Sequence, residues 1–154
     1  KALGLSAEED LLVWSSFNDD AGWLKLPLMP GAAAYMRGLR ALDRVAIVTN
    51  RPEAARGVTE QWLVRNEVEF DELHVTENPS KLEYVRSAGW LPRAVTEDAW
   101  HHATAFAGAG VPVVLVDYPW NRKGSDTNIH RVKDLGEALA AMRRLLDEGE
   151  RKNS

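Results

Sequence analysis

The chain has 154 residues, a formal net charge of −4 and no cysteine. This length is enough for one domain with a buried core, and the lack of cysteine excludes disulfides, thiolate metal sites and cysteine nucleophiles. The acidic balance argues against nucleic-acid binding, and no apolar run is long enough for a membrane span, so we expect a cytoplasmic protein that binds a small molecule.

The first thirty residues are predicted to form an appendage to the core. Ser6 and Glu9 have the spacing of a capping box, so residues 5–17 are expected to form a helix. The next segment is polar with scattered aromatic residues, and its prolines keep it extended. We divide the chain into a partial helical cap at residues 1–30, an α/β core at residues 31–149 and a polar tail at residues 150–154.

Strands and helices alternate along the core. Short apolar, β-branched runs predict strands at residues 45–50, 70–76, 94–96 and 111–118. Helical spacing predicts helices at residues 31–42, 52–66, 81–88, 99–109 and 134–148, with a loop at residues 119–128. Because parallel strands need a crossover connection, this alternation predicts an α/β fold in which a Rossmann-like parallel sheet lies between two layers of helices.

Polar side chains follow each predicted strand. The carboxyl ends of parallel strands share one edge of a sheet, which is where ligands bind in open α/β folds. A hydroxyl, a lysine and paired carboxylates are the parts of a magnesium-dependent phosphoryl-transfer site. The residues at this edge are Thr49, Asn50 and Arg51; Thr76, Glu77, Asn78 and Lys81; Glu97 and Asp98; and Asp117, Asn121 and Arg122.

The order of these groups resembles the haloacid dehalogenase superfamily of phosphohydrolases, and within it the 5'-nucleotidases that act on deoxyribonucleotides. The apolar run ending in Thr49-Asn50-Arg51-Pro52 resembles the second motif of that branch. Lys81 at the start of a helix matches the third motif, and Glu97-Asp98 after a short strand matches the fourth. The segment from Phe17 to Trp23 resembles the end of the small helical cap.

The resemblance implies a Mg²⁺-dependent phosphomonoesterase that acts on a nucleotide or another small phosphate ester. In that role Thr49 and Lys81 would hold the phosphoryl oxygens, Glu97 and Asp98 would orient Mg²⁺, and Asn50, Arg51, Phe17 and Trp23 would contact the substrate. The partner would be a small phosphorylated substrate, with no nucleic acid and no membrane. The competing interpretation is a noncatalytic binding or interaction protein that retains the phosphate cradle, and a phosphoacceptor receiver domain ranks third.

One part of the family pattern is absent from the sequence. The first motif is a strand ending in Asp-x-Asp, and no apolar strand in this chain ends in that pattern. In the family this strand lies between those at residues 45–50 and 94–96, and its absence would leave a slot about 10 Å wide. We expect upstream residues, another segment or a second chain of a homodimer to fill the slot, or the two strands to close on each other; we favour upstream residues.

Each candidate residue also has an ordinary structural interpretation. Thr49 can be a plain strand-end residue, Lys81 a solvated helix-start lysine, and Asp98 a helix N-cap. Arg51 and Arg122 can pair with nearby carboxylates instead of phosphate. His101 and His102 suggest a metal site, but adjacent side chains on a helix diverge by about 100°, which favours packing or exposure.

Overall fold

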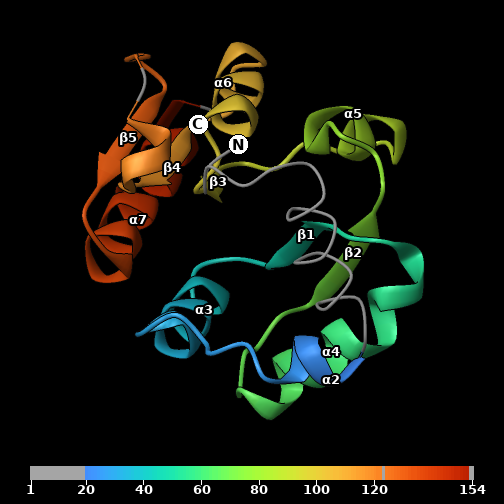
Figure 1. Cartoon of the computed structure of the whole chain (residues 1–154). Helices are drawn as coiled ribbons and strands as arrows, with labels where there is room; N and C mark the ends of the chain where they lie inside the picture. The colour runs from blue at the N-terminus through green and yellow to red at the C-terminus, as the bar shows by residue number, and fades with distance from the viewer. Residues whose placement is uncertain (1–19, 123, 153–154) are drawn as a thin grey trace.

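The strands lie in two separate parallel sheets (Figure 1). This computed structural model describes residues 20–122 and 124–152. In the first sheet β1 (Ala46–Asn50) pairs with β2 (Glu72–Thr76). In the second, β4 (Val113–Val116) lies between β3 (Val95–Glu97) and β5 (Ile129–Val132). All these pairings are parallel, which confirms the α/β class expected from the sequence.

Helices alternate with β1 to β4 in the order that the sequence predicts, whereas β5 follows β4 without an α-helix between them. The described helices are α2 (Asp20–Leu24), α3 (Ala32–Arg40), α4 (Arg56–Arg65), α5 (Lys81–Ser87), α6 (Trp100–Gly108) and α7 (Leu135–Lys152). Two short 3₁₀ turns, η1 (Glu53–Ala55) and η2 (Pro119–Asn121), follow β1 and β4. No described helix is long and apolar enough to cross a membrane.

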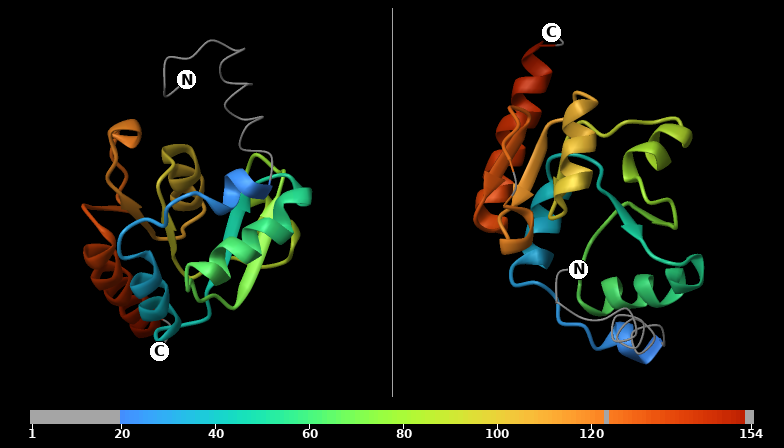
Figure 2. Two further views of the ribbon diagram at one scale, coloured as in Figure 1. Left: turned by 60° about the horizontal axis from the view of Figure 1, so that its bottom comes forward. Right: turned by 45° about the horizontal axis from the view of Figure 1, so that its top comes forward.

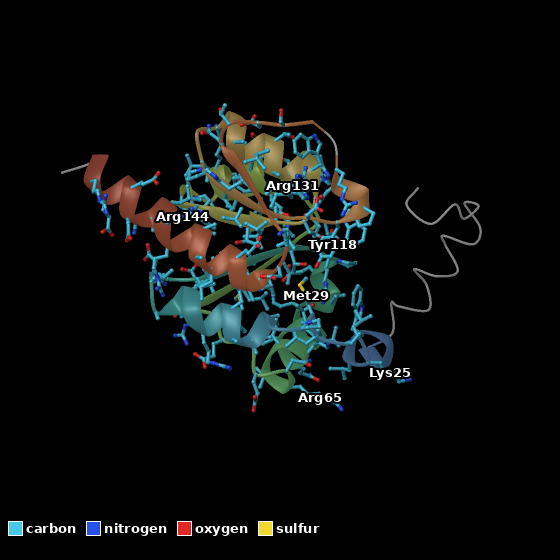
Figure 3. All side chains as sticks on the ribbon, turned by 90° about the vertical axis from the view of Figure 1, so that its left-hand side faces the viewer. Lys25, Met29, Arg65, Tyr118, Arg131 and Arg144 are labelled. Carbon is cyan, nitrogen blue, oxygen red and sulfur yellow. The ribbon has the colours of Figure 1, made fainter. Side chains whose placement is uncertain are left out.

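The buried strand β4 organises the two helical layers. Val113 and Leu115 pack in one apolar cluster with side chains of α5 and α6. Val114 and Val116 pack in a second cluster with side chains of α3 and α7. Since successive side chains of a strand point to opposite faces, α5 and α6 cover one face of the sheet and α3 and α7 cover the other. Figures 2 and 3 show α3 beside α7, as the predicted three-layer fold requires.

Local sequence signals fix several element boundaries. The Ser80 hydroxyl accepts a hydrogen bond of 3.2 Å from the backbone amide of Glu83, so Ser80 caps the start of α5 as expected. Gly110 follows α6 with a φ of 81°, a left-handed conformation that favours glycine. These two signals place the start of α5 and the turn into β4 where the sequence predicts them.

The structure differs from the sequence prediction at several elements. β5 was not predicted, because only its first and last residues, Ile129 and Val132, are apolar. The third predicted strand is displaced by one residue, so Glu97 is the last residue of β3 and does not follow it. Helix α7 continues to Lys152, beyond the predicted end at residue 148.

An open groove separates the edge of the first sheet at β1 from the edge of the second sheet at β3. β1 pairs only with β2 and β3 only with β4 within the described chain, so each has one edge without a strand partner. A groove of about 760 Å³ lies between these edges and is lined by residues 45–48 and 94–97. No strand among residues 20–122 and 124–152 fills the slot expected for an absent strand, and the alternative in which β1 and β3 close on each other is wrong.

The segment before α3 contacts both halves of the molecule. The Trp62 indole on α4 donates a hydrogen bond of 2.8 Å to the Leu26 carbonyl. Three residues later, the Met29 sulfur accepts a hydrogen bond of 3.3 Å from the Tyr118 hydroxyl, and Figure 3 shows these two side chains close together. The helix predicted at residues 5–17 lies outside the described residues.

Replacement of Gly38 by alanine is expected to destabilise the contact between α3 and α7. A Cβ atom at this position would lie 2.5 Å from a methyl group of Leu139. Overpacking of this kind costs about 1–3 kcal/mol, and urea denaturation of Gly38→Ala measures it as a lower free energy of unfolding.

The matched control is Gly57→Ala on α4, where a Cβ atom would have nothing within 4 Å. Alanine is the better helix former, so this variant is expected to gain up to about 1 kcal/mol. A Gly38→Ala protein as stable as Gly57→Ala would contradict the close packing of α3 on α7.

Candidate active site

The polar residues at the carboxyl ends of the strands lie around two openings. Lys81, Thr96 and Glu97 line the groove between the sheets. A second cavity of about 530 Å³ lies beside it, with Asn50 and Arg51 on its wall. Residues 45–48 line the groove, and Asn50 and Arg51 line the second cavity. Thr49 lies between these two groups in the sequence. The predicted edge is therefore formed, with its residues divided between two neighbouring openings.

Lys81 and Glu97 form the central ion pair of this edge. The Lys81 ammonium donates to the Glu97 carboxylate at 2.7 Å, and the two side chains are only 17% and 6% exposed. Burial raises the pKa of Glu97, while the Lys81 charge opposes that shift. The low exposure of Lys81 excludes its interpretation as a solvated lysine at the start of the helix. The pair places a buried cation at the start of α5, where the helix dipole alone would disfavour it.

Thr49, Asn50 and Arg51 have different surroundings at the end of β1. The half-buried Thr49 side chain has no hydrogen-bond partner among the described residues, so its hydroxyl is available to a ligand. The Asn50 amide donates to the backbone carbonyl of Asn78, at the end of β2. This bond fixes the Asn50 side chain across the two strand ends.

Arg51 is held by an aromatic ring and a buried hydroxyl. Its guanidinium lies over the Trp23 ring, 4.1 Å from the ring centre, and donates to the Thr59 hydroxyl at 2.9 Å. Burial lowers the pKa of Arg51. The structure thus places Arg51 against Trp23, a contact that the sequence did not predict. Phe17, the other predicted cap residue, lies outside the described part of the chain.

Glu97 and Asp98 supply oxygen ligands of the right kind for Mg²⁺, although too few to complete its shell. Mg²⁺ takes six oxygen ligands, and one Glu97 oxygen already accepts from Lys81. No group of three or more acidic or histidine side chains in residues 20–122 and 124–152 could hold a metal ion. Asp98 is exposed and is not the cap of α6, whose N-cap is Ala99, so the capping interpretation of Asp98 is wrong.

Asn121 is an important site residue to which sequence reasoning assigned no role. Its side chain is fully buried and donates to the carbonyls of Asp98 and Val116, both at 2.7 Å. Its oxygen accepts from the Arg131 guanidinium at 2.8 Å. Asn121 therefore ties the loop after β3 to the end of β4. The only available signal was its position four residues after Asp117.

Asp117 and Arg122 form a local charge cluster with β5. Arg122 and Arg131 pair with the Asp117 carboxylate at 2.8 and 3.0 Å and lower its pKa. Arg122 thus pairs with a nearby carboxylate, one of its two sequence interpretations. Beside this cluster, the rings of Tyr118 and Trp120 stack with centroids 4.4 Å apart.

His102 is the buried histidine of the second cavity. It is 7% exposed, and its ring lies 3.9 Å from that of the exposed His101. Burial, followed by the charges of Lys81 and His101, lowers the pKa of His102 to about 4. The ring is therefore neutral at pH 7, which agrees with packing, the interpretation favoured from sequence.

Comparisons with known proteins agree with this geometry. No protein-family model matches the chain. The chain is 25% identical to the protein named Putative nucleotidase YqfW of Bacillus subtilis, over 88% of this chain and 69% of that protein. It is 23% identical to the protein named Putative nucleotidase BH1399 of Halalkalibacterium halodurans, over 91% and 71% of the two chains.

A solved structure agrees in fold. The crystal structure of a haloacid dehalogenase-like family hydrolase from Xanthomonas campestris superposes with a TM-score of 0.66. The match covers 96% of this chain and 67% of that one, at 17% identity. Together these comparisons confirm the resemblance that the motifs indicate.

His102 makes the stability of the fold depend on pH. The unfolded chain protonates this histidine near pH 6.5, whereas the folded chain does so only near pH 4. The unfolded state binds more protons between these values, so stability falls as the pH falls from 6.5 to 4. Urea denaturation at pH 7 and at pH 4 measures this loss in the free energy of unfolding. We expect the loss to be smaller in His102→Gln than in the unmodified chain, by on the order of 2 kcal/mol. Exposed His130 gives the control His130→Gln, and equal pH slopes in both variants would contradict the assignment.

Truncation of Asn121 is expected to loosen the joint between β3 and β4. Asn121→Ala leaves two carbonyls and Arg131 without their buried partner, which costs at least about 2 kcal/mol in urea denaturation. Asn128→Ala is the control, because the side chain of the exposed Asn128 makes a single hydrogen bond of 3.3 Å, to the Ala107 carbonyl, within the described chain. A loss no larger than that of the control would show that the buried hydrogen bonds contribute little.

Proposed function

We propose that this chain, whose fold is that of haloacid dehalogenase-like hydrolases, forms the larger part of a magnesium-dependent phosphomonoesterase. The observation that carries the proposal is the largely buried Lys81–Glu97 ion pair at the carboxyl edge of the sheet. The Thr49 hydroxyl, at the end of β1, has no hydrogen-bond partner among the described residues. The names of the two bacterial relatives favour a nucleotide as substrate.

The residues of this edge have complementary roles in the proposed enzyme. The Thr49 hydroxyl donates to one phosphoryl oxygen, and the Lys81 ammonium balances the phosphoryl charge in a poorly solvated position. Asn50 and Arg51 contact the substrate from the wall of the second cavity. Trp23 holds the Arg51 guanidinium from its far side and so orients it toward the cavity.

Glu97 and Asp98 are the proposed metal ligands. A bound Mg²⁺ would neutralise negative charge on the phosphoryl group. Asn121 would hold the Asp98 backbone in place through its hydrogen bond to the Asp98 carbonyl. The nucleophilic carboxylate and the remaining ligand oxygens must come from outside the described residues, because these contain no suitable cluster.

The proposed partner is a small phosphorylated molecule, with neither nucleic acid nor membrane, and the proposed compartment is the cytoplasm. The net charge of −4 and the absence of cysteine support both statements. The second candidate function is a noncatalytic phosphate-binding protein. It is favoured by the same absence of a nucleophilic carboxylate from the described part of the site.

Hydrolysis of p-nitrophenyl phosphate and of deoxynucleoside monophosphates tests the proposal. The assay uses the longest natural product of the gene, with Mg²⁺ or with EDTA. We expect turnover that EDTA abolishes, and a loss of about 10²-fold or more in kcat for Lys81→Ala, comparable to removal of one charge-stabilising donor. The exposed Lys133 provides the control Lys133→Ala, which should keep full activity.

Two results would overturn parts of this proposal. Full turnover by Lys81→Ala would remove Lys81 from the site. Complete inactivity of the folded protein, with retained binding of inorganic phosphate in calorimetry, would establish the noncatalytic function instead.

A further inference from the structure

The second cavity has a floor of two buried polar side chains. Thr76 and His102 line this cavity and are each only 7% exposed, and we call these two residues the floor. Asn50, Glu77 and His101 also line the cavity and are exposed, so they lie nearer to solvent. Polar groups in a poorly solvated position are costly unless they find hydrogen-bond partners. The hydrogen bonds that the floor residues can still make therefore indicate which ligand suits the cavity.

The hydrogen-bonding groups of the floor are incompletely satisfied within the described chain. The His102 ring nitrogens have no hydrogen-bond partner there. Neither nitrogen is fully enclosed, because every enclosed polar side-chain atom of the described residues has a partner. The Thr76 hydroxyl accepts a hydrogen bond of 3.1 Å from the Asn78 amide but donates none to a described residue. Both floor residues can therefore still bind a ligand in the cavity.

A neutral group that both donates and accepts hydrogen bonds suits this floor. Burial, followed by the charges of Lys81 and His101, lowers the pKa of His102 to about 4, so the ring is neutral at pH 7. A neutral imidazole presents one N–H donor and one acceptor nitrogen, and the Thr76 hydroxyl adds a donor. A hydroxyl or an amide group can pair with both kinds of partner. An anionic oxygen only accepts, so it would leave the acceptor nitrogen of His102 unpaired.

The charges around the cavity also disfavour a second phosphate there. Arg51 supplies a positive charge to the lining, and the exposed Glu77 carboxylate supplies a negative one. The charge of Lys81 acts on His102, so the floor lies within electrostatic range of the lysine proposed to hold the phosphoryl group. The cavity is therefore placed to receive the uncharged part of a phosphate ester.

On the basis of the phosphomonoesterase function proposed above, we propose that the second cavity binds the leaving group of the substrate, and that His102 and Thr76 select leaving groups with a neutral hydroxyl or amide. A pentose supplies such hydroxyls, and the edge of a nucleobase supplies such amides. Ligand sites commonly fix the orientation of a small molecule through a few polar groups of this kind. His102 is thus a specificity residue as well as a packing residue.

NMR of the imidazole nitrogens tests binding at His102 without catalysis. The probes are thymidine, 2-deoxyribose 5-phosphate and phenyl phosphate, each added to the full natural chain in EDTA. His102→Gln assigns the His102 signals by removing them. We expect thymidine to shift these signals more than phenyl phosphate does, because the phenyl group has no hydrogen-bond donor or acceptor.

The other probe identifies which part of the leaving group is recognised. A comparable shift with 2-deoxyribose 5-phosphate makes sugar hydroxyls the recognised groups, and a shift with thymidine alone makes it the nucleobase. A shift with thymidine in a protein that hydrolyses no ester would refute the enzyme but retain this binding site. Shifts no larger than those caused by phenyl phosphate would overturn the proposal.

Kinetics then separate recognition from a merely structural role. His102→Phe keeps a buried ring but removes both hydrogen-bonding nitrogens. We expect it to lower kcat/KM at least about 10-fold for thymidine 5'-monophosphate but to leave the value for phenyl phosphate within about 2-fold. His102→Gln keeps a donor and an acceptor and should recover most of the loss. Equal losses for both esters would make His102 a packing residue only and overturn the proposal.

The matched control is His130→Phe, at an exposed position on β5, which should change kcat/KM for neither ester. Thr76 provides a second pair of variants, which tests the floor even if His102→Phe does not fold. Thr76→Val removes the hydroxyl with little change in shape, whereas Thr76→Ser keeps it. We expect the selective loss of kcat/KM for thymidine 5'-monophosphate in Thr76→Val alone. Unchanged selectivity in Thr76→Val would remove Thr76 from the proposed contact.

Discussion

The requirement that buried backbone groups find hydrogen-bond partners governs this structure. β4 meets it completely, because it pairs on both sides and is covered on both faces. β1 and β3 meet it on one side only, although helices already cover the space between them. Because β1 and β3 are unpaired on these sides, a groove remains between them. The polar residues at the strand ends are then divided between this groove and the second opening.

Several charged side chains at this edge lie against an opposite charge. Lys81 lies against Glu97, and Asp117 lies between Arg122 and Arg131. Isolated buried charges are costly, so the pairing with Lys81 allows the buried Glu97 carboxylate to remain at this end of the sheet, whereas the Asp117 cluster is more exposed. A site of this kind is already organised before any ligand arrives, which is the condition for electrostatic stabilisation of a phosphoryl group.

The sequence was most informative where a residue's environment is set by its own strand or helix. β1 and β4 were predicted from their apolar runs, and Lys81 and Glu97 were predicted to lie at the same edge because parallel strands end there. The ion pair between them was not predicted. Their actual contact depended on the placement of α5 by its Ser80 cap. Such local signals predicted most of the fold.

The missed features depend on contacts between distant segments. β5 has little apolar pattern and is stable as an edge strand because it pairs with β4. Arg131 on β5 completes the hydrogen bonds of Asn121, so overlooking the strand also concealed that residue's role. The groove could be anticipated only through the motif order of a known family, since no local property of β1 or β3 marks an edge as unpaired.

The short stretch from Leu26 to Met29 has a mechanical consequence for the two halves of the molecule. Leu26 is bound to α4 on the side of the first sheet, and Met29 contacts Tyr118 beyond β4 in the second. Three peptide units separate these attachments, and an extended chain of that length reaches only about 10 Å. This stretch therefore acts as a tether that limits how far the sheets can spread, so the width of the groove is restrained even while its edges remain unpaired.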